Sequence, residues 1–202
     1  MRNIKGGGMS NRNYMSQCIC IATAMLGNLI LTGNGIADVI RYDAPNKNKN
    51  VTIIDSFPLW DMHKTEICRT LVLFIGGKIA WSRLTEPRKS EVLWESSSDA
   101  VAIMDAPDKA NVRIVILVID HEKASQRDVN FDDILAEAKK VVDSEKDIKH
   151  LSVCSVSKLR WVSPVLINGE MRYARSGKEV NIPFSINIVD GEELKAVLRE
   201  HL

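Results

Sequence analysis

The feature of this sequence that most constrains its fold is a nearly continuous apolar run over residues 112–119. Seven of these eight residues are apolar, and only Arg113 is polar. A strand with one face in solvent alternates apolar and polar residues, whereas an unbroken apolar run needs cover on both faces. The run therefore predicts a central strand of a sheet that is covered on both sides.

A helix and a second β-forming run follow this strand. Over residues 131–142 the apolar residues fall on one helical stripe, and Asn130 is placed to cap the first turn. Residues 148–156 are again rich in β-forming side chains. Strand, helix and strand over 112–156 predict one βαβ unit with two parallel strands. We therefore expect an α/β or α+β fold with a mixed β-sheet.

Two dipeptides predict tight hairpins in this sheet. Gly76-Gly77 separates two strand-like runs, and the central residues of such a turn need positive φ, which glycine adopts at little cost. Asn168-Gly169 lies between two further β-forming runs and is a strong turn signal by the same argument. We expect hairpins over residues 70–84 and 163–174.

The chain is expected to end in a helix. Asp190 followed by Glu193 has the spacing of a capping box, and the next apolar residues, Leu194, Val197 and Leu198, fit one helical stripe. We find no linker after residue 38, and domains commonly have this size. We therefore expect a single globular α/β domain over residues 38–202.

The first 37 residues differ from the rest of the chain. They contain Arg2, Lys5 and Arg12 but no acidic residue, and an apolar run follows from Cys18 to Leu31. A basic start, a short apolar run and small residues before a cleavage point are the parts of a signal peptide. We expect residues 1–37 to be a signal peptide, and the mature protein to be exported to the periplasm or secreted.

Two other interpretations of the N-terminal segment remain open. A membrane anchor through residues 18–40 would need about 20 apolar residues, and this stretch includes Asn28 and Asn34. The segment could also be a buried helix of a cytosolic protein. Apart from an uncleaved anchor, we expect no contact with a membrane.

The cysteines agree with export. Cys18 and Cys20 lie inside the apolar run and would be removed with it, which leaves Cys68 and Cys154. An even number of cysteines in an oxidising compartment predicts a disulfide, and two buried thiols are the alternative. The spacing of the remaining pair matches no metal-binding motif, so we expect no metal.

Asp120-His121-Glu122 is the best candidate for a catalytic site. It directly follows the predicted central strand, and ligands bind beyond the carboxyl ends of strands in open α/β sheets. A carboxylate beside an imidazole can support acid–base chemistry. Adjacent side chains at a strand end point in different directions, however. We therefore expect an exposed His121 and no catalytic role for the three residues.

Trp81, Arg160 and Trp161 are the candidates for a binding surface. Exposed tryptophan and arginine are enriched at the centres of protein interfaces, although tryptophans are also common core residues. The chain has 27 basic and 26 acidic residues, so it lacks the basic excess typical of nucleic-acid binders. It also lacks the glycine-rich motifs that hold nucleotides, and we expect no cofactor.

These observations predict an exported cell-envelope or secreted protein that carries no recognisable catalytic motif. We expect it to bind another protein, as an accessory, inhibitor or immunity-type factor. The alternative is a small secreted hydrolase or transferase that uses Asp120, His121 and Glu122.

Overall fold

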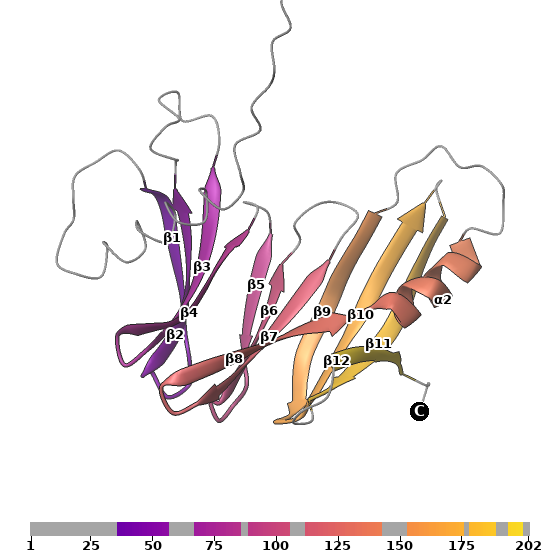
Figure 1. Cartoon of the computed structure of the whole chain (residues 1–202). Helices are drawn as coiled ribbons and strands as arrows, with labels where there is room; N and C mark the ends of the chain where they lie inside the picture. Colours follow the sequence, from indigo (N-terminus) through magenta and orange to yellow (C-terminus); the bar gives the residue numbers. More distant parts are fainter. Residues whose placement is uncertain are drawn as a thin grey trace, which may run out of the picture.

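The computed structural model describes residues 36–56, 67–85, 89–105, 112–142, 153–175, 178–188 and 194–199. These residues form twelve strands and one helix, arranged in two sheets (Figure 1). Most of the predicted signal peptide, residues 1–35, lies outside this part of the chain. None of the helical structure among the described residues is long and apolar enough to cross a membrane.

The first sheet is an antiparallel meander of four strands in chain order. Its strands are β1 (Ile36–Asp43), β2 (Lys49–Ser56), β3 (Cys68–Ile75) and β4 (Lys78–Thr85). Gly76 and Gly77 form the turn between β3 and β4, with φ of 56° and 80°. The predicted Gly-Gly hairpin is therefore confirmed, and for the predicted reason.

The second sheet has eight strands in the order β5-β6-β7-β8-β12-β11-β10-β9. Its strands are β5 (Ser90–Trp94), β6 (Ala100–Asp105), β7 (Arg113–Asp120), β8 (Lys123–Asn130), β9 (Val153–Ser163), β10 (Leu166–Arg175), β11 (Lys178–Asn187) and β12 (Leu194–Leu198). Neighbouring strands are antiparallel except β8 and β12, which pair in parallel. The sheet curls into a nearly closed barrel.

The expected α/β or α+β fold is wrong, because the described residues are almost entirely β-structure. The βαβ unit over 112–156 does not form: β7 turns directly into the antiparallel strand β8. Helix α2 (Asp132–Val142) lies where a helix was predicted, but it follows β8. Strand β8 was not predicted because most of its side chains are polar and only Val129 is buried, so it lacks a clear apolar alternation.

Two further predictions are corrected. Asn168-Gly169 lies inside β10, and the turn between β9 and β10 is at residues 164–165. The predicted C-terminal helix is strand β12 instead. Leu194 and Ala196 of β12 are buried while Lys195 and Val197 are exposed, which is the period of two expected for a strand.

Strands β6 and β7 are buried on both faces, and for β7 the apolar run over 112–119 predicted this. Alternate side chains such as Ile103 and Leu117 join a core with β2 and β3 of the four-stranded sheet. Their neighbours, such as Ala102 and Ile116, join a second core inside the barrel. The covering layers on the two faces are formed mainly by strands.

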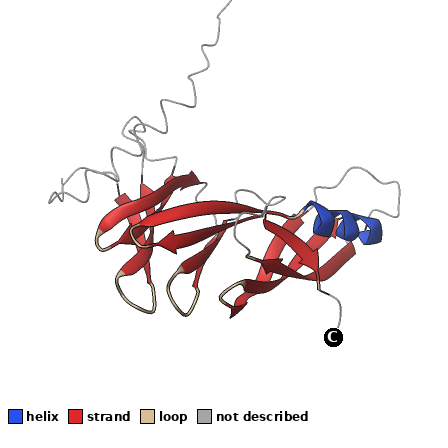
Figure 2. Cartoon of the chain, turned by 60° about the horizontal axis from the view of Figure 1, so that its bottom comes forward, coloured by secondary structure: helices blue, strands red, loops and turns tan. Residues whose placement is uncertain are grey.

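Helix α2 covers one part of the barrel wall (Figure 2), where it contacts β10, β11 and β12. Ile134 and Ala138 of the helix are fully buried in the barrel core. Phe131, just before the helix, packs edge-to-face on Phe184 of β11, with ring centroids 5.3 Å apart.

Three tryptophans connect strands that are not neighbours in either sheet. Each indole N–H donates a hydrogen bond across a seam: Trp81 Nε1 to Gln126 Oε1 at 2.8 Å, Trp94 Nε1 to Tyr42 O at 3.0 Å, and Trp161 Nε1 to Leu93 O at 3.0 Å. The first two join the sheets to each other, and the third joins β9 to β5 where the barrel closes.

A buried carboxylate orders the loop between β5 and β6. Glu95 is only 2% exposed, and its carboxylate accepts hydrogen bonds from Ser96 Oγ and from the N–H and Oγ of Ser97. Burial alone would raise the pKa of Glu95, but the serine hydrogen bonds outweigh it and hold this pKa below its ordinary value.

The lowered pKa of Glu95 predicts acid lability. A carboxyl whose pKa is lower in the folded state stabilises the fold above its unfolded pKa, about 4.3, and this contribution is lost as the pH falls through the folded pKa. Urea unfolding between pH 7 and pH 3 should show this loss. In Glu95→Gln, stability at neutral pH should be lower and its pH dependence flatter. Glu122→Gln, which changes a carboxyl that is 78% exposed, is the control. Equal slopes of the free energy of unfolding against pH in all three proteins would contradict the assignment.

Candidate functional site

The sequence candidate Asp120-His121-Glu122 lies on an exposed hairpin tip. Asp120 ends β7, and the next two residues form the turn to β8. The side chains of Asp120 and His121 are 90% and 94% exposed, and His121 Nε2 lies 3.6 Å from Asp120 Oδ1. Glu122 faces Lys78 across 3.8 Å on the neighbouring hairpin. The three side chains do not converge in a hollow, and His121 is exposed as expected.

The predicted binding residues Trp81, Arg160 and Trp161 do not share one surface. Both tryptophans are partly buried and form the seam hydrogen bonds described above. Arg160 is exposed, and its guanidinium group has no hydrogen-bond or ion-pair partner within the described ranges. It is the one member of the predicted set whose polar group is left available for a ligand.

The cysteines are not at disulfide distance, so the structure does not contain the predicted Cys68–Cys154 bridge. Cys68 is on β3 of the four-stranded sheet and Cys154 is on β9 of the barrel. Cys154 is buried in the barrel core, and burial raises the pKa of its thiol to about 11. It is therefore a thiol of low reactivity at neutral pH.

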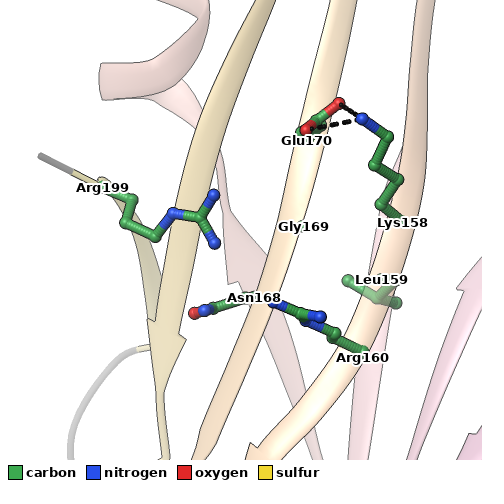
Figure 3. A pocket seen from close by; sticks show the side chains of 7 residues that line it. All are labelled: Lys158, Leu159, Arg160, Asn168, Gly169, Glu170 and Arg199. Atoms are coloured by element: carbon green, nitrogen blue, oxygen red, sulfur yellow. Dashed lines mark hydrogen bonds and ion pairs between the residues drawn. The ribbon is translucent and has the colours of Figure 1, made fainter. Parts of the chain in front are cut away.

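A hollow of about 350 Å³ lies on the outer surface of the barrel around Arg160 (Figure 3). We call the outward face of β9–β12 the outer wall, and this depression the hollow. The residues that line it are Lys158, Leu159, Arg160, Asn168, Gly169, Glu170 and Arg199. They come from β9, β10 and the end of β12, so strand pairing fixes their relative positions.

A β-bulge shapes the floor of the hollow. Arg160 pairs with Asn168 and Ser157 pairs with Glu170, so two residues of β9 face the single residue Gly169. The extra residue is accommodated at Lys158, whose φ of 53° is in the left-handed region. This conformation is unusual for a residue other than glycine, and such outliers cluster at functional sites.

Gly169 is required here because of the aromatic ring beneath it. A Cβ at this position would lie 2.6 Å from Phe184 Cζ and 3.1 Å from Leu159 Cδ1. Phe184 is fully buried in the barrel core, so its ring has no space to move away. The glycine that suggested a turn in the sequence instead allows β10 to lie directly on this ring.

The hollow carries an excess of positive charge. Lys158 Nζ forms an ion pair with Glu170 at 2.9 Å, which leaves the guanidinium groups of Arg160 and Arg199 without a carboxylate among the described residues. The side-chain amide of Asn168 contacts Ser185 Oγ at 2.9 Å and, oriented to satisfy both amide atoms, accepts from Arg199 Nη1 at 3.2 Å. Asn168 therefore helps hold Arg199 over the hollow.

This arrangement suits binding of an anion. Arginine presents several N–H donors in a plane and recognises carboxylate or phosphate groups. The lining side chains include one carboxylate, and it is engaged with Lys158. Across the residues that the structure describes, no group of three or more His, Cys, Asp or Glu side chains could hold a metal ion.

Sequence reasoning found Arg160 but missed the other residues of the hollow. Asn168 and Gly169 were noticed, although as a turn. Arg199 lies in the segment for which a C-terminal helix is predicted, and only its position after β12 brings it to Asn168. Register between strands, which this sequence does not reveal, is the missing information.

The sequence matches no protein-family model and no curated protein. The chemistry of the site is therefore inferred from the geometry of this chain alone.

We expect Gly169→Ala to destabilise the protein by about 1–3 kcal/mol, because the new methyl group overpacks a rigid core. Urea unfolding measures the change. Phe184→Leu should relieve the contact, so the double variant should lose less stability than the sum of the two single variants. Strict additivity, or a stabilising Gly169→Ala change, would show that the ring does not restrict this position.

Proposed function

We propose that this protein is an exported, non-catalytic binding protein that docks another protein on the outer wall of its barrel, with Arg160 at the centre of the interface. The observation that carries this proposal is the exposed guanidinium of Arg160, which has no partner among the described residues, at a hollow of fixed geometry. Arginine is among the residues that contribute most to protein interfaces. The export part of the proposal comes from the N-terminal sequence alone.

Strand register places Arg160 in a continuous row of side chains across the outer wall. Arg160 pairs with Asn168, Asn168 with Ser185, and Ser185 with Val197. The row thus runs from a cation through two polar groups to an apolar side chain that is 51% exposed. A mixed polar and apolar surface of this kind is typical of interfaces that form between separately folded proteins.

Exposed apolar residues flank the hollow along both outer strands of the wall. Val162 and Val165 lie at the turn between β9 and β10, and Val197 lies on β12 in the same row as Arg160. Scattered exposed valines are ordinary on a protein surface. Their position around the hollow adds apolar area that a partner would cover, and this supports the proposed docking face.

The positions of Asp120, His121 and Glu122 do not favour the alternative of a hydrolase or transferase. A general acid–base site needs a concave pocket and a place for the reacting atom near the catalytic groups. Asp120, His121 and Glu122 lie on an exposed turn, and the described geometry gives them no such place.

The proposal predicts that the native partner depends on Arg160. Tagged wild-type protein and Arg160→Ala, produced in the native host, would be purified from the envelope and the medium, and co-purifying proteins quantified by mass spectrometry. An interface arginine of this kind contributes about 1–3 kcal/mol, so the variant should retain about five- to one-hundred-fold less partner.

Arg41→Ala is the matched control, because Arg41 is an exposed strand arginine on β1 of the other sheet. It should retain the partner at the wild-type level. Equal retention of every co-purifying protein by Arg160→Ala, or the absence of any protein enriched over an untagged control, would contradict the proposal.

A further inference from the structure

We infer that the hollow is a carboxylate-binding site, and that the partner therefore presents an acidic segment to the outer wall. This inference rests on the proposed function and names the chemistry of the group that is recognised. The residues that carry it are Arg160, Arg199, Lys158 and Glu170.

The two arginines approach the hollow from different strands. Arg160 projects from β9, and Arg199 follows β12, where its N–H donates to Pro183 O at 3.1 Å. In the view of Figure 3 the two guanidinium groups lie on opposite sides of β10, that of Arg160 toward β9 and that of Arg199 toward β11. The backbone of Arg199 is anchored, and its Nη1 lies 3.2 Å from the amide of Asn168, so part of the ordering cost of binding is already met.

Glu170 shows which chemical group this surface accepts. Its carboxylate lines the hollow and pairs with Lys158, the residue held in the left-handed conformation by the bulge. The chain thus already places a carboxylate on one of its three cations. With Glu170 counted, the hollow keeps a net charge of about two positive units, and an incoming carboxylate would be attracted to the arginines.

The surroundings of the hollow indicate what should accompany the carboxylate. Val162 is 52% exposed near Arg160 on β9, and Val197 is 51% exposed at the other end of the row. Neighbouring strands lie about 4.8 Å apart, so three strand spacings, about 14 Å, separate Arg160 from Val197. An extended peptide of about four to five residues spans this distance. A short segment with acidic and apolar residues therefore fits.

Glu170 provides a variant that should gain affinity. In Glu170→Gln the competing negative charge is removed and Lys158 becomes available to the ligand. Glu170 is a partly exposed strand residue and the change preserves its shape, so we expect the fold to be kept. General destabilisation would lower the affinity in every variant. It would not raise the affinity when an acidic residue is removed and lower it when a basic residue is removed.

The test uses defined peptides and the intact protein. A blocked, fluorescein-labelled decapeptide with four glutamates among valine and serine residues would be titrated at low salt, followed by anisotropy. Its controls are the same peptide with glutamine in place of glutamate, and one with phosphoserine in place of glutamate. We expect the glutamate peptide to bind at least tenfold more tightly than the glutamine peptide, and at least as tightly as the phosphoserine peptide.

Arg160→Ala and Arg199→Ala should each weaken binding of the glutamate peptide about three- to tenfold, and Glu170→Gln should tighten it about two- to fivefold. Arg41→Ala, which removes the same charge from the other sheet, should bind as the wild type does. Equal binding of the glutamine peptide, tighter binding of the phosphoserine peptide, or weaker binding by Glu170→Gln would overturn the inference.

The peptide test and the partner test can give different outcomes, so failure of the carboxylate inference is distinguishable from failure of the proposed function. If the native partner depends on Arg160 but the glutamate peptide shows no preference over glutamine, the carboxylate inference is wrong and the docking face stands. If the peptide series behaves as expected but the native partner ignores Arg160→Ala, the carboxylate site stands and the proposed function is wrong.

Discussion

The rest of this structure depends on the burial of both faces of β6 and β7. Their side chains alternate between a core shared with the four-stranded sheet and a core inside the barrel. Ile116 and Leu117 are adjacent in sequence, and both are fully buried, in different cores. Exposing either apolar face of such a strand to water costs free energy. The four-stranded sheet and the barrel therefore stabilise each other, and β6 and β7 form one layer between the two cores.

The shared layer of β6 and β7 explains why the candidate site is on the opposite side of the barrel. Strands β9–β12 have one face filled by core side chains such as Phe184, and their other face is open to solvent. The hollow exists because a bulge at Lys158 and a glycine over Phe184 lower the surface locally. A site built on paired strands over a packed core has well-fixed geometry, which favours binding without large rearrangement.

The sequence predicted local features well and their connections poorly. The buried strand at 112–119, the Gly-Gly hairpin and the helix near 131–142 all follow from short-range patterns, and all are present. The βαβ unit failed because strand β8 is mostly polar, and the C-terminal strand failed because its short apolar pattern also fits a helix. Arg160 could be selected by residue type. Its position beside the same hollow as Arg199 depends on strand order, which no local pattern of this sequence encodes.

Native-state amide hydrogen exchange of Ile116→Val tests most directly whether the layer formed by β6 and β7 couples the two cores. This change removes one methylene-sized group from the barrel core and should cost about 0.5–1.5 kcal/mol. If the layer of β6 and β7 couples the cores, the slowest-exchanging amides of β2 and β3 should lose as much protection from hydrogen exchange as those of β10 and β11. Loss confined to β10 and β11, with β2 and β3 unchanged, would show that the two sheets are independent and would contradict this account.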